Sequence, residues 1–262
     1  MERKEDIGRM HTAGITIDFE YAELWRGLHR SNPLSFKKPY SFTVYKDRDK
    51  YMAEDWRGRV RYEDDDASEV MQSAVDNGGL IFIRSGVYDV SSKTITIEKP
   101  IVLIGEVLIP FGASGGVVLK TTDTTKTLLE IKAQCVVIRN ILFEGPGESK
   151  GDPSGIGIYM DTAHHSTLEN IRVWKFTGAQ GIKIDGGGES ITLRKVHIRN
   201  CDIGLEIYDE KGDGITELPY LESVKLGPYN REGGRIWWVQ GFVIKNLNVY
   251  NNYERGLWLC GH

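Results

Sequence analysis

The stretch Ile138-Arg139-Asn140-Ile141-Leu142-Phe143 decides the fold, because its pattern of apolar and polar residues returns four more times. The other copies are Leu168-Glu169-Asn170-Ile171-Arg172-Val173, Leu193-Arg194-Lys195-Val196-His197-Ile198, Leu221-Glu222-Ser223-Val224-Lys225-Leu226 and Ile244-Lys245-Asn246-Leu247-Asn248-Val249. Their first residues are 30, 25, 28 and 23 positions apart. Self-similarity at such a period is typical of proteins built from stacked structural units.

A second pattern, glycine followed by alternating apolar residues, lies between these copies. It occurs as Gly157-Ile158-Tyr159-Met160, Gly181-Ile182-Lys183-Ile184, Gly204-Leu205-Glu206-Ile207 and Gly256-Leu257-Trp258-Leu259. We assign Arg235-Ile236-Trp237-Trp238 to the same place in the fourth unit, slipped by one residue. Two alternating strands per unit, without helical spacing between them, predict the turns of a parallel β-solenoid. A sandwich of short strands also gives alternation of apolar and polar residues, but it does not predict that the same two patterns return in turn along the chain.

The polar residue at the third position of the first pattern is Asn in three of the five copies. Asn tolerates the left-handed backbone region and bonds to nearby backbone, so it suits a sharp bend between two strands. Lys195 and Ser223 interrupt this series.

A short amphipathic helix is predicted ahead of the repeats. Asp66-Ala67-Ser68-Glu69 has the form of a capping box, Gly78-Gly79 ends the helix, and the apolar residues have helical spacing: Ala67, Val70, Met71, Ala74 and Val75. Leu80-Ile81-Phe82-Ile83 then begins a strand, and Gly86-Val87-Tyr88 is read as a turn. We expect the helix to cover the open end of the solenoid, where apolar interior and strand edges would otherwise be exposed.

These residues carry a resemblance to a known group of proteins. The stretches involved are Asp64-Asp65-Asp66-Ala67, Val70-Met71-Gln72-Ser73-Ala74-Val75-Asp76, Gly78-Gly79, Gly86-Val87-Tyr88 and Ile104-Gly105. Together they resemble the entry segment of the pectin-lyase-like superfamily, which includes pectate lyases, polygalacturonases, sugar epimerases and viral tailspikes. The resemblance implies an all-β fold, a right-handed single-stranded parallel β-helix, over residues 64–262. It also implies a saccharide groove on the sheet that the glycine-led strands form.

Residues 1–63 lack the repeat and are predicted to form a separate N-terminal attachment or docking module. Tyr40-Ser41-Phe42-Thr43-Val44-Tyr45, Tyr51-Met52-Ala53 and the stretch from Trp56 to Tyr62 indicate a β-meander. The alternative is that this region only packs on the side of the solenoid.

Composition excludes several classes of protein. A formal net charge of -4 gives no electrostatic attraction to nucleic acid or to an anionic membrane, and no apolar run is long enough to cross a bilayer. The three cysteines are far apart, so neither a zinc knuckle nor a disulfide framework is indicated. The charged start, Met1 to Asp6, lacks the apolar segment of a secretory signal. A free enzyme that degrades saccharides would need such a signal for export, whereas a tailspike leaves its host by lysis. We therefore expect the protein on a virion or an extracellular surface rather than in the cytoplasm.

Alternation places four candidate catalytic residues on the outer face of the glycine-led sheet: Asp161, Lys183, Asp185 and Glu206. Asp161 and Asp185 are predicted to share a register position one coil apart, which gives a pair of carboxylates suited to glycoside hydrolysis. A lyase would instead use carboxylates to hold Ca²⁺ and Lys183 as the base, while no other cofactor is required. The competing interpretation is a solvated strand face on which Lys183 neutralises its neighbours. The signature motifs of polygalacturonases and pectate lyases are not found in the expected form.

Four aromatic residues are candidates for binding sugar rings: Tyr159, Tyr208, Trp237 and Trp258. Trp237 and Trp258 are expected in the outward column of Glu206, and burial under a loop or another subunit is the alternative. The chain is thus predicted to bind and cleave a polysaccharide or surface glycan. The alternative function is a non-catalytic structural or receptor-binding part of a virion or surface appendage. A homotrimer, as in tailspikes, would cover the last strand, Leu257 to Leu259; the other explanation is that the protein continues.

Overall fold

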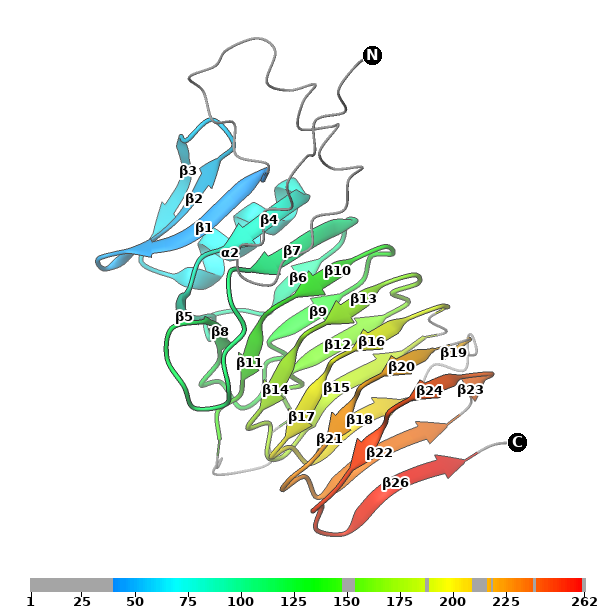
Figure 1. The fold of residues 1–262 in the computed structure, drawn as a ribbon. Helices are drawn as coiled ribbons and strands as arrows, with labels where there is room; N and C mark the ends of the chain where they lie inside the picture. The colour runs from blue at the N-terminus through cyan, green and yellow to red at the C-terminus, as the bar shows by residue number, and fades with distance from the viewer. Residues whose placement is uncertain are drawn as a thin grey trace, which may run out of the picture. The chain divides into compact units, whose positions relative to one another are not determined.

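The computed structural model describes residues 40–147, 154–186, 189–208, 216–217, 219–237 and 239–260. All of them belong to one compact unit, residues 38–262. Most strands are arranged in three sheets that run side by side along the molecule, so that the chain passes from one sheet to the next in successive coils (Figure 1).

Sheet A has ten strands in the order β24 (Val243–Lys245), β20 (Tyr220–Glu222), β16 (Thr192–Arg194), β13 (Thr167–Glu169), β10 (Val137–Arg139), β7 (Ile101–Gly105), β4 (Gly79–Ile83), β1 (Phe42–Asp47), β2 (Lys50–Asp55) and β3 (Val60–Asp64). Sheet B has seven: β25 (Asn248–Val249), β21 (Lys225–Leu226), β17 (His197–Arg199), β14 (Arg172–Trp174), β11 (Leu142–Glu144), β8 (Val117–Lys120) and β5 (Gly86–Asp89). Sheet C also has seven: β26 (Arg255–Cys260), β22 (Glu232–Trp237), β18 (Ile203–Ile207), β15 (Gln180–Asp185), β12 (Ile158–Asp161), β9 (Leu129–Ile131) and β6 (Ile95–Ile97). A small parallel pair, β19 (Thr216–Glu217) and β23 (Val239–Gln240), lies outside them.

Neighbouring coils pair in parallel in all three sheets, which confirms the predicted all-β parallel β-helix. Each of the seven coils in the described residues gives one strand to each sheet. The first two coils were not recognised by the sequence pattern. In particular Gly86-Val87-Tyr88 was read as a turn but belongs to strand β5, because Tyr88 is fully buried and points into the core.

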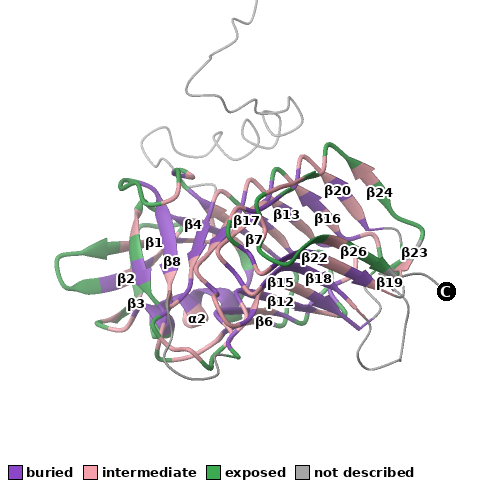
Figure 2. Cartoon of the chain, turned by 90° about the horizontal axis from the view of Figure 1, so that it is seen from below, coloured by how far each residue is buried: buried purple, intermediate pink, exposed green. Residues whose placement is uncertain are grey.

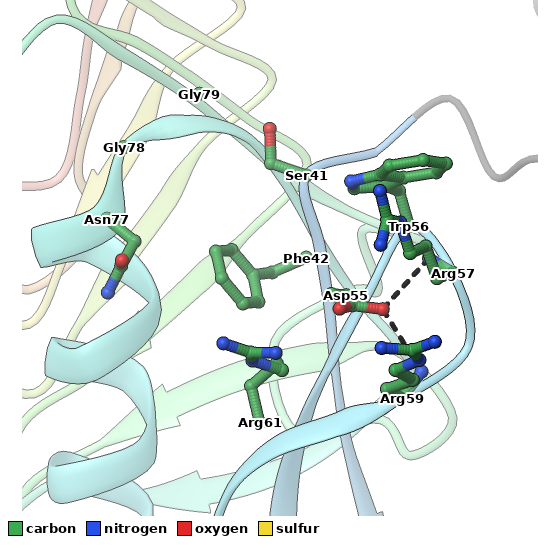
Figure 3. A pocket seen from close by; sticks show the side chains of 10 residues that line it. All are labelled: Ser41, Phe42, Asp55, Trp56, Arg57, Arg59, Arg61, Asn77, Gly78 and Gly79. Carbon is green, nitrogen blue, oxygen red and sulfur yellow. Dashed lines mark hydrogen bonds between the residues drawn. The ribbon is translucent and has the colours of Figure 1, made fainter.

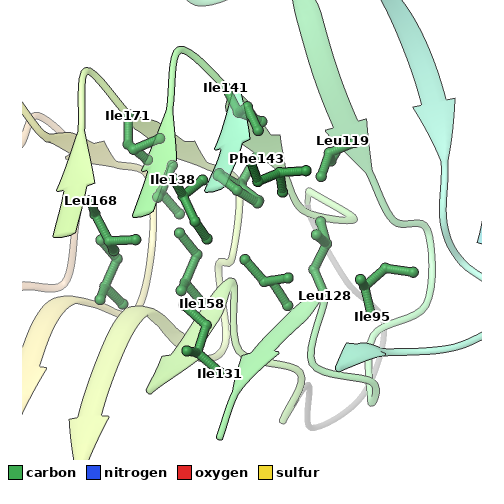
Figure 4. Close-up of a cluster of buried hydrophobic side chains, with 14 of the residues drawn as sticks. Ile95, Leu119, Leu128, Ile131, Ile138, Ile141, Phe143, Ile158, Leu168 and Ile171 are labelled. Carbon is green, nitrogen blue, oxygen red and sulfur yellow. The ribbon is translucent and has the colours of Figure 1, made fainter. Parts of the chain in front are cut away.

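Equivalent apolar residues of successive coils stack into buried columns. In sheet A the central column is in strict register and runs through Leu103, Ile138, Leu168, Leu193 and Leu221. All five residues are at most 1% exposed, and Figure 4 shows Ile138 and Leu168 among their buried neighbours. Figure 2 shows the result along the solenoid, with buried positions alternating with partly exposed ones on the strands. This burial is the main source of stability, since no single coil can bury its inward face alone.

The bend between sheets A and B has the left-handed conformation predicted for it. Asn140, Asn170 and Asn246 have φ values of 61°, 54° and 58°, and the side-chain amide of Asn170 donates to Asn140 Oδ1 at 2.8 Å. Lys195 and Ser223 adopt the same conformation, with φ of 53° and 56°, although they lack the short amide that favours it.

The glycines of β15, β18 and β22 allow the next coil of sheet C to approach closely. A Cβ atom at Gly181 would lie 2.9 Å from the carbonyl oxygen of Gly204, one at Gly204 would lie 2.5 Å from that of Gly233, and one at Gly233 would lie 2.1 Å from that of Gly256. The glycine of the fourth unit is therefore Gly233, and the predicted one-residue slip at Arg235 is wrong. Arg235 pairs with Glu206 in regular register, and Trp238, expected to point inward, lies outside the described residues.

Helix α2 (Ala67–Asn77) covers the first coil, as predicted. The side chain of Asp66 caps it by accepting from the backbone N–H of Ser68 at 2.7 Å. The predicted apolar positions are all buried. Glu69 does not complete the capping box, because its carboxylate accepts from Lys93 Nζ at 2.6 Å instead.

The predicted meander is present as strands β1, β2 and β3, which pair in antiparallel fashion. Strand β1 also pairs in parallel with β4, so the meander extends sheet A beyond the first coil. A role of residues 1–63 in attachment stays a prediction, and residues 1–39 lie outside the described part of the chain.

Candidate functional site

The outer face of sheet C carries two neighbouring columns of polar and aromatic residues. The first column follows the strand register through Glu130, Tyr159, Lys183, Glu206, Arg235 and Trp258. The second column, two residues further along each strand, contains the register pair Asp161 and Asp185. The structure thus brings all four candidate catalytic residues to one face of one sheet.

Asp161 and Asp185 are direct neighbours across strands β12 and β15. A Cβ atom built at Gly186 would lie 2.8 Å from Asp161 Oδ1, so the Asp161 carboxylate is turned toward the end of the Asp185 strand. Gly186 permits this approach because it has a φ of 73° and no side chain. Two carboxylates one strand spacing apart, about 4.8 Å between backbones, are thereby held on the same face.

Asp185 is almost fully covered, with only 2% of the residue exposed. Its Oδ2 accepts a hydrogen bond of 3.2 Å from Tyr159 Oη and lies 3.7 Å from Lys183 Nζ. Both partners belong to the outward column, so the Asp185 carboxylate also points outward although it is covered. Alternation in the sequence identifies the face of a side chain but not what covers it.

Burial raises the pKa of the Tyr159 phenol above its ordinary value of 10, and the negative charges of Asp185 and Asp161 raise it further. The phenol therefore keeps its proton at neutral pH. Tyr159 can donate a hydrogen bond or a proton at this site, but it is unsuited to act as a base.

Glu206 belongs to a network of charged residues that reaches the next coil. Its Oε2 accepts from Gln180 Nε2 at 2.8 Å, and its Oε1 lies 3.6 Å from Arg235 NH1. Arg235 also holds the buried Glu232 through two hydrogen bonds of 2.6 and 2.7 Å, which lower the pKa of the Glu232 carboxyl. Sequence reasoning missed Arg235, Gln180 and Glu232; aligning Gly233 with Gly204 would have placed Arg235 beside Glu206.

Three of the four aromatic candidates form an edge-to-face row at the C-terminal end of the face, while Tyr159 lies on β12 beside Lys183. Tyr208 and Trp237 have ring centroids 5.1 Å apart at an interplanar angle of 84°, and Trp237 and Trp258 are 5.0 Å apart at 78°. Trp258 shares the column of Glu206, as expected, but Trp237 does not: it pairs with Cys260, because the strand is in register with Gly233 rather than slipped. The indole Nε1 of Trp237 is buried and has no hydrogen-bond partner among the described residues.

No group of three or more His, Cys, Asp or Glu side chains in the described residues is arranged to hold a metal ion. The ammonium group of Lys183 lies 3.7 Å from Asp185 Oδ2, and its positive charge would repel a Ca²⁺ ion at this carboxylate. The residues of this face therefore do not fit a Ca²⁺ site. None of the helices in the described part of the chain is long and apolar enough to cross a membrane.

No family model and no curated protein matches the chain. Among solved structures, the alginate lyase from Paenibacillus sp. str. FPU-7 is similar, with a TM-score of 0.47 and 18% identity over 74% of each chain. The A-module of the mannuronan C-5 epimerase AlgE6 from Azotobacter vinelandii gives a TM-score of 0.40 and 13% identity over 74% of this chain and 68% of that one. ORF18 of Geobacillus virus E2 gives 0.37 and 12% over 98% and 67%. These likenesses are too distant to assign an activity or a superfamily; on its own topology, three parallel sheets with a left-handed bend between sheets A and B, the chain is a parallel β-helix.

Proposed function

We propose that the chain binds a polysaccharide along the outer face of sheet C and cleaves it beside Asp161 and Asp185. One observation supports this proposal: the carboxylates of Asp161 and Asp185 are neighbours in register. The phenol of Tyr159 and the ammonium group of Lys183 both contact the Asp185 carboxylate. Acid and base groups in contact on one face of a sheet are the parts that glycosidic-bond cleavage needs.

The four residues have different roles in this proposal. Asp161, which is partly exposed, contacts the substrate, while Tyr159 and Lys183 hold Asp185 in place from the same face. In hydrolysis one carboxyl group protonates the leaving oxygen and the other activates water or attacks the sugar. In β-elimination Lys183, in its neutral amine form, removes the proton next to the substrate carboxylate, and Tyr159 returns a proton to the leaving oxygen. Glu206 has partners at both oxygens, so it positions Arg235 rather than reacting.

The aromatic row supports the binding half of the proposal. Trp258 is 38% exposed, and the rings of Tyr208, Trp237 and Trp258 line one end of the face. Sugar rings bind to aromatic side chains through their apolar faces.

The test is incubation of the protein with a panel of neutral and acidic polysaccharides. New reducing ends without absorbance from a double bond indicate hydrolysis, and both together indicate elimination. Asp161→Asn is expected to remove the activity, whereas Glu222→Gln, the matched change on the outer face of sheet A, is expected to keep it. EDTA should have no effect, because the face does not fit Ca²⁺.

The burial of Asp185 favours a second candidate, a non-catalytic glycan-binding or structural part of a virion or surface appendage. In that case Asp185, Tyr159 and Lys183 only stabilise the sheet. The same panel decides between the two: a polymer that binds without being cut supports this second candidate. A homotrimer belongs to this proposal, and mass measured in solution by light scattering tests it.

A further inference from the structure

A pocket of about 480 Å³ lies at the other end of the protein, beside the β2–β3 turn and the C-terminal end of α2 (Figure 3). Ligand pockets in proteins typically measure about 300–1,000 Å³, so this one has room for a small ligand. It shares no residue with the outer face of sheet C. The lining residues that matter here are Asp55, Trp56, Arg57, Arg59, Arg61 and Asn77.

The local backbone explains why three arginines meet at this pocket. Residues 55–58 form a tight turn, in which the Gly58 N–H donates to the Asp55 carbonyl at 2.9 Å and the Asp55 N–H donates to the Arg59 carbonyl at 2.9 Å. Gly58 has a φ of 78°, a conformation that glycine adopts without strain. Arg57 lies in the turn, and Arg59 and Arg61 follow at alternate positions into β3, so all three line the same pocket.

The charges of the pocket are not balanced. Its one carboxylate, Asp55, is engaged by the backbone, since Oδ1 accepts from the N–H groups of Arg57 at 2.9 Å and Arg59 at 3.1 Å. Three guanidinium groups and one carboxylate leave a net charge of +2 among the lining residues. In the described part of the chain, no carboxylate lies within 4.0 Å of the guanidinium nitrogens of these arginines, whereas Arg139, Arg194, Arg231 and Arg235 are all in ion pairs.

The pocket also has a flat aromatic wall. The guanidinium group of Arg57 lies over the Trp56 ring at 4.5 Å from its centroid, and Trp56 is 38% exposed. Stacking on a ring orients a guanidinium group while its N–H donors stay available. Planar guanidinium groups bind phosphate and carboxylate through paired hydrogen bonds.

We infer that this pocket binds a ligand with at least two oxyanion groups, phosphate or carboxylate, held by Arg57, Arg59 and Arg61. The inference is independent of the polysaccharide-cleaving function proposed for sheet C. Two kinds of ligand carry such oxyanion groups: a phosphorylated molecule and an acidic sugar.

The experiment is isothermal titration of the full chain at low ionic strength with two probes, inorganic pyrophosphate and digalacturonate. The probe that binds with the higher affinity shows whether the pocket prefers phosphate or carboxylate groups. The double variant Arg59→Gln/Arg61→Gln is expected to weaken binding at least about tenfold, because it removes two of the three charged donors. Arg84→Gln, which removes an exposed arginine outside the pocket, is expected to leave affinity unchanged. Thermal unfolding of each variant checks that it is folded.

Asp55→Asn gives a change of the opposite sign. Asparagine keeps an oxygen acceptor for the turn and removes the negative charge, so anion affinity should rise about two- to fivefold. Glu222→Gln, on the outer face of sheet A, should not change it. Absence of saturable binding of both probes overturns the inference, and so does equal affinity in the double variant and Arg84→Gln.

Discussion

The phenol of Tyr159 on β12 donates a hydrogen bond to the buried carboxylate of Asp185 on β15, across 3.2 Å. This contact links neighbouring coils on the face proposed to bind substrate. It also means that the protonation of one group affects the other, since the negative charge of Asp185 contributes to the raised pKa of Tyr159.

The first prediction concerns stability at alkaline pH. Because the pKa of Tyr159 is raised in the folded state, the unfolded chain loses this proton first, near pH 10, while the folded chain keeps it. The contribution of Tyr159 to stability is therefore complete below about pH 10 and declines as pH rises toward the folded value. Thermal unfolding between pH 8 and 11 should show a steeper loss for the unmodified protein than for Tyr159→Phe. Tyr253→Phe, which removes an exposed phenol, should match the unmodified protein; equal slopes in all three would contradict the prediction.

The second prediction concerns the glycine of sheet C. Gly204→Ala places a Cβ 2.5 Å from the carbonyl oxygen of Gly233, a backbone atom that can move only if the coils separate. We expect a loss of about 2–3 kcal/mol in the free energy of unfolding, the range of overpacked cores. At Gly256 the nearest atom to an added Cβ is Val249 Cγ1 at 3.5 Å, an ordinary contact. Gly256→Ala is thus the control and should unfold at nearly the same denaturant concentration as the unmodified protein.

The third prediction concerns the bend at Lys195. A non-glycine residue in the left-handed region costs roughly 1–2 kcal/mol, and Asn reduces that cost through local hydrogen bonds. Lys195→Asn should therefore raise the free energy of unfolding by about 0.5–1 kcal/mol, measured by chemical denaturation. Lys195→Ala, which offers no amide, should give no gain. A gain with Ala equal to that with Asn would show that removal of the lysine charge, rather than the bend, is responsible.

The fourth prediction concerns Arg235, which makes two hydrogen bonds to the carboxylate of Glu232, itself 1% exposed. Arg235→Gln removes the two hydrogen bonds of Arg235 and leaves Arg231 NH1, at 2.9 Å from Glu232 Oε1, as a remaining cation, so we expect a loss of about 1.5–3 kcal/mol in the free energy of unfolding. Since Arg235 lowers the pKa of Glu232, the stability from this pair is present above the unfolded value near 4.5 and is lost as pH falls through the folded value. The difference between variant and unmodified protein should shrink as the pH of the unfolding experiment is lowered below about 4. If the difference in the free energy of unfolding between the two proteins stayed constant across this pH range, the ion pair with Glu232 would not be its cause.

Much of the fold could be predicted from the sequence because two of its constraints are local. A left-handed bend selects Asn140, Asn170 and Asn246, and a close approach of coils selects Gly181 and Gly204. The second coil escaped the pattern because eleven residues, 106–116, separate β7 from β8, whereas later coils have a tight bend between the corresponding strands. The solenoid is therefore longer than the repeat in the sequence.

The candidate site was less predictable. Alternation gives the direction of a side chain, and it placed Asp161, Lys183 and Asp185 on one face. It does not give burial, so the covered state of Asp185 could not be read from the sequence. Arg235 was missed as a partner of Glu206 for another reason: Gly233-Gly234 offers two possible alignments, and only the register of β22 with β18 distinguishes them.

The most direct test of the proposed active face is the initial rate at which a polysaccharide from the panel is cleaved by the unmodified protein, Asp161→Asn and Glu222→Gln. Loss of the charge at Asp161 should lower the rate at least about a hundredfold, as expected for removal of a general acid or base, while Glu222→Gln keeps it. Folding of both variants is checked by their unfolding transitions. An Asp161→Asn protein that cuts as fast as Glu222→Gln, or an unmodified protein that cuts no polymer at all, would contradict catalysis at this face.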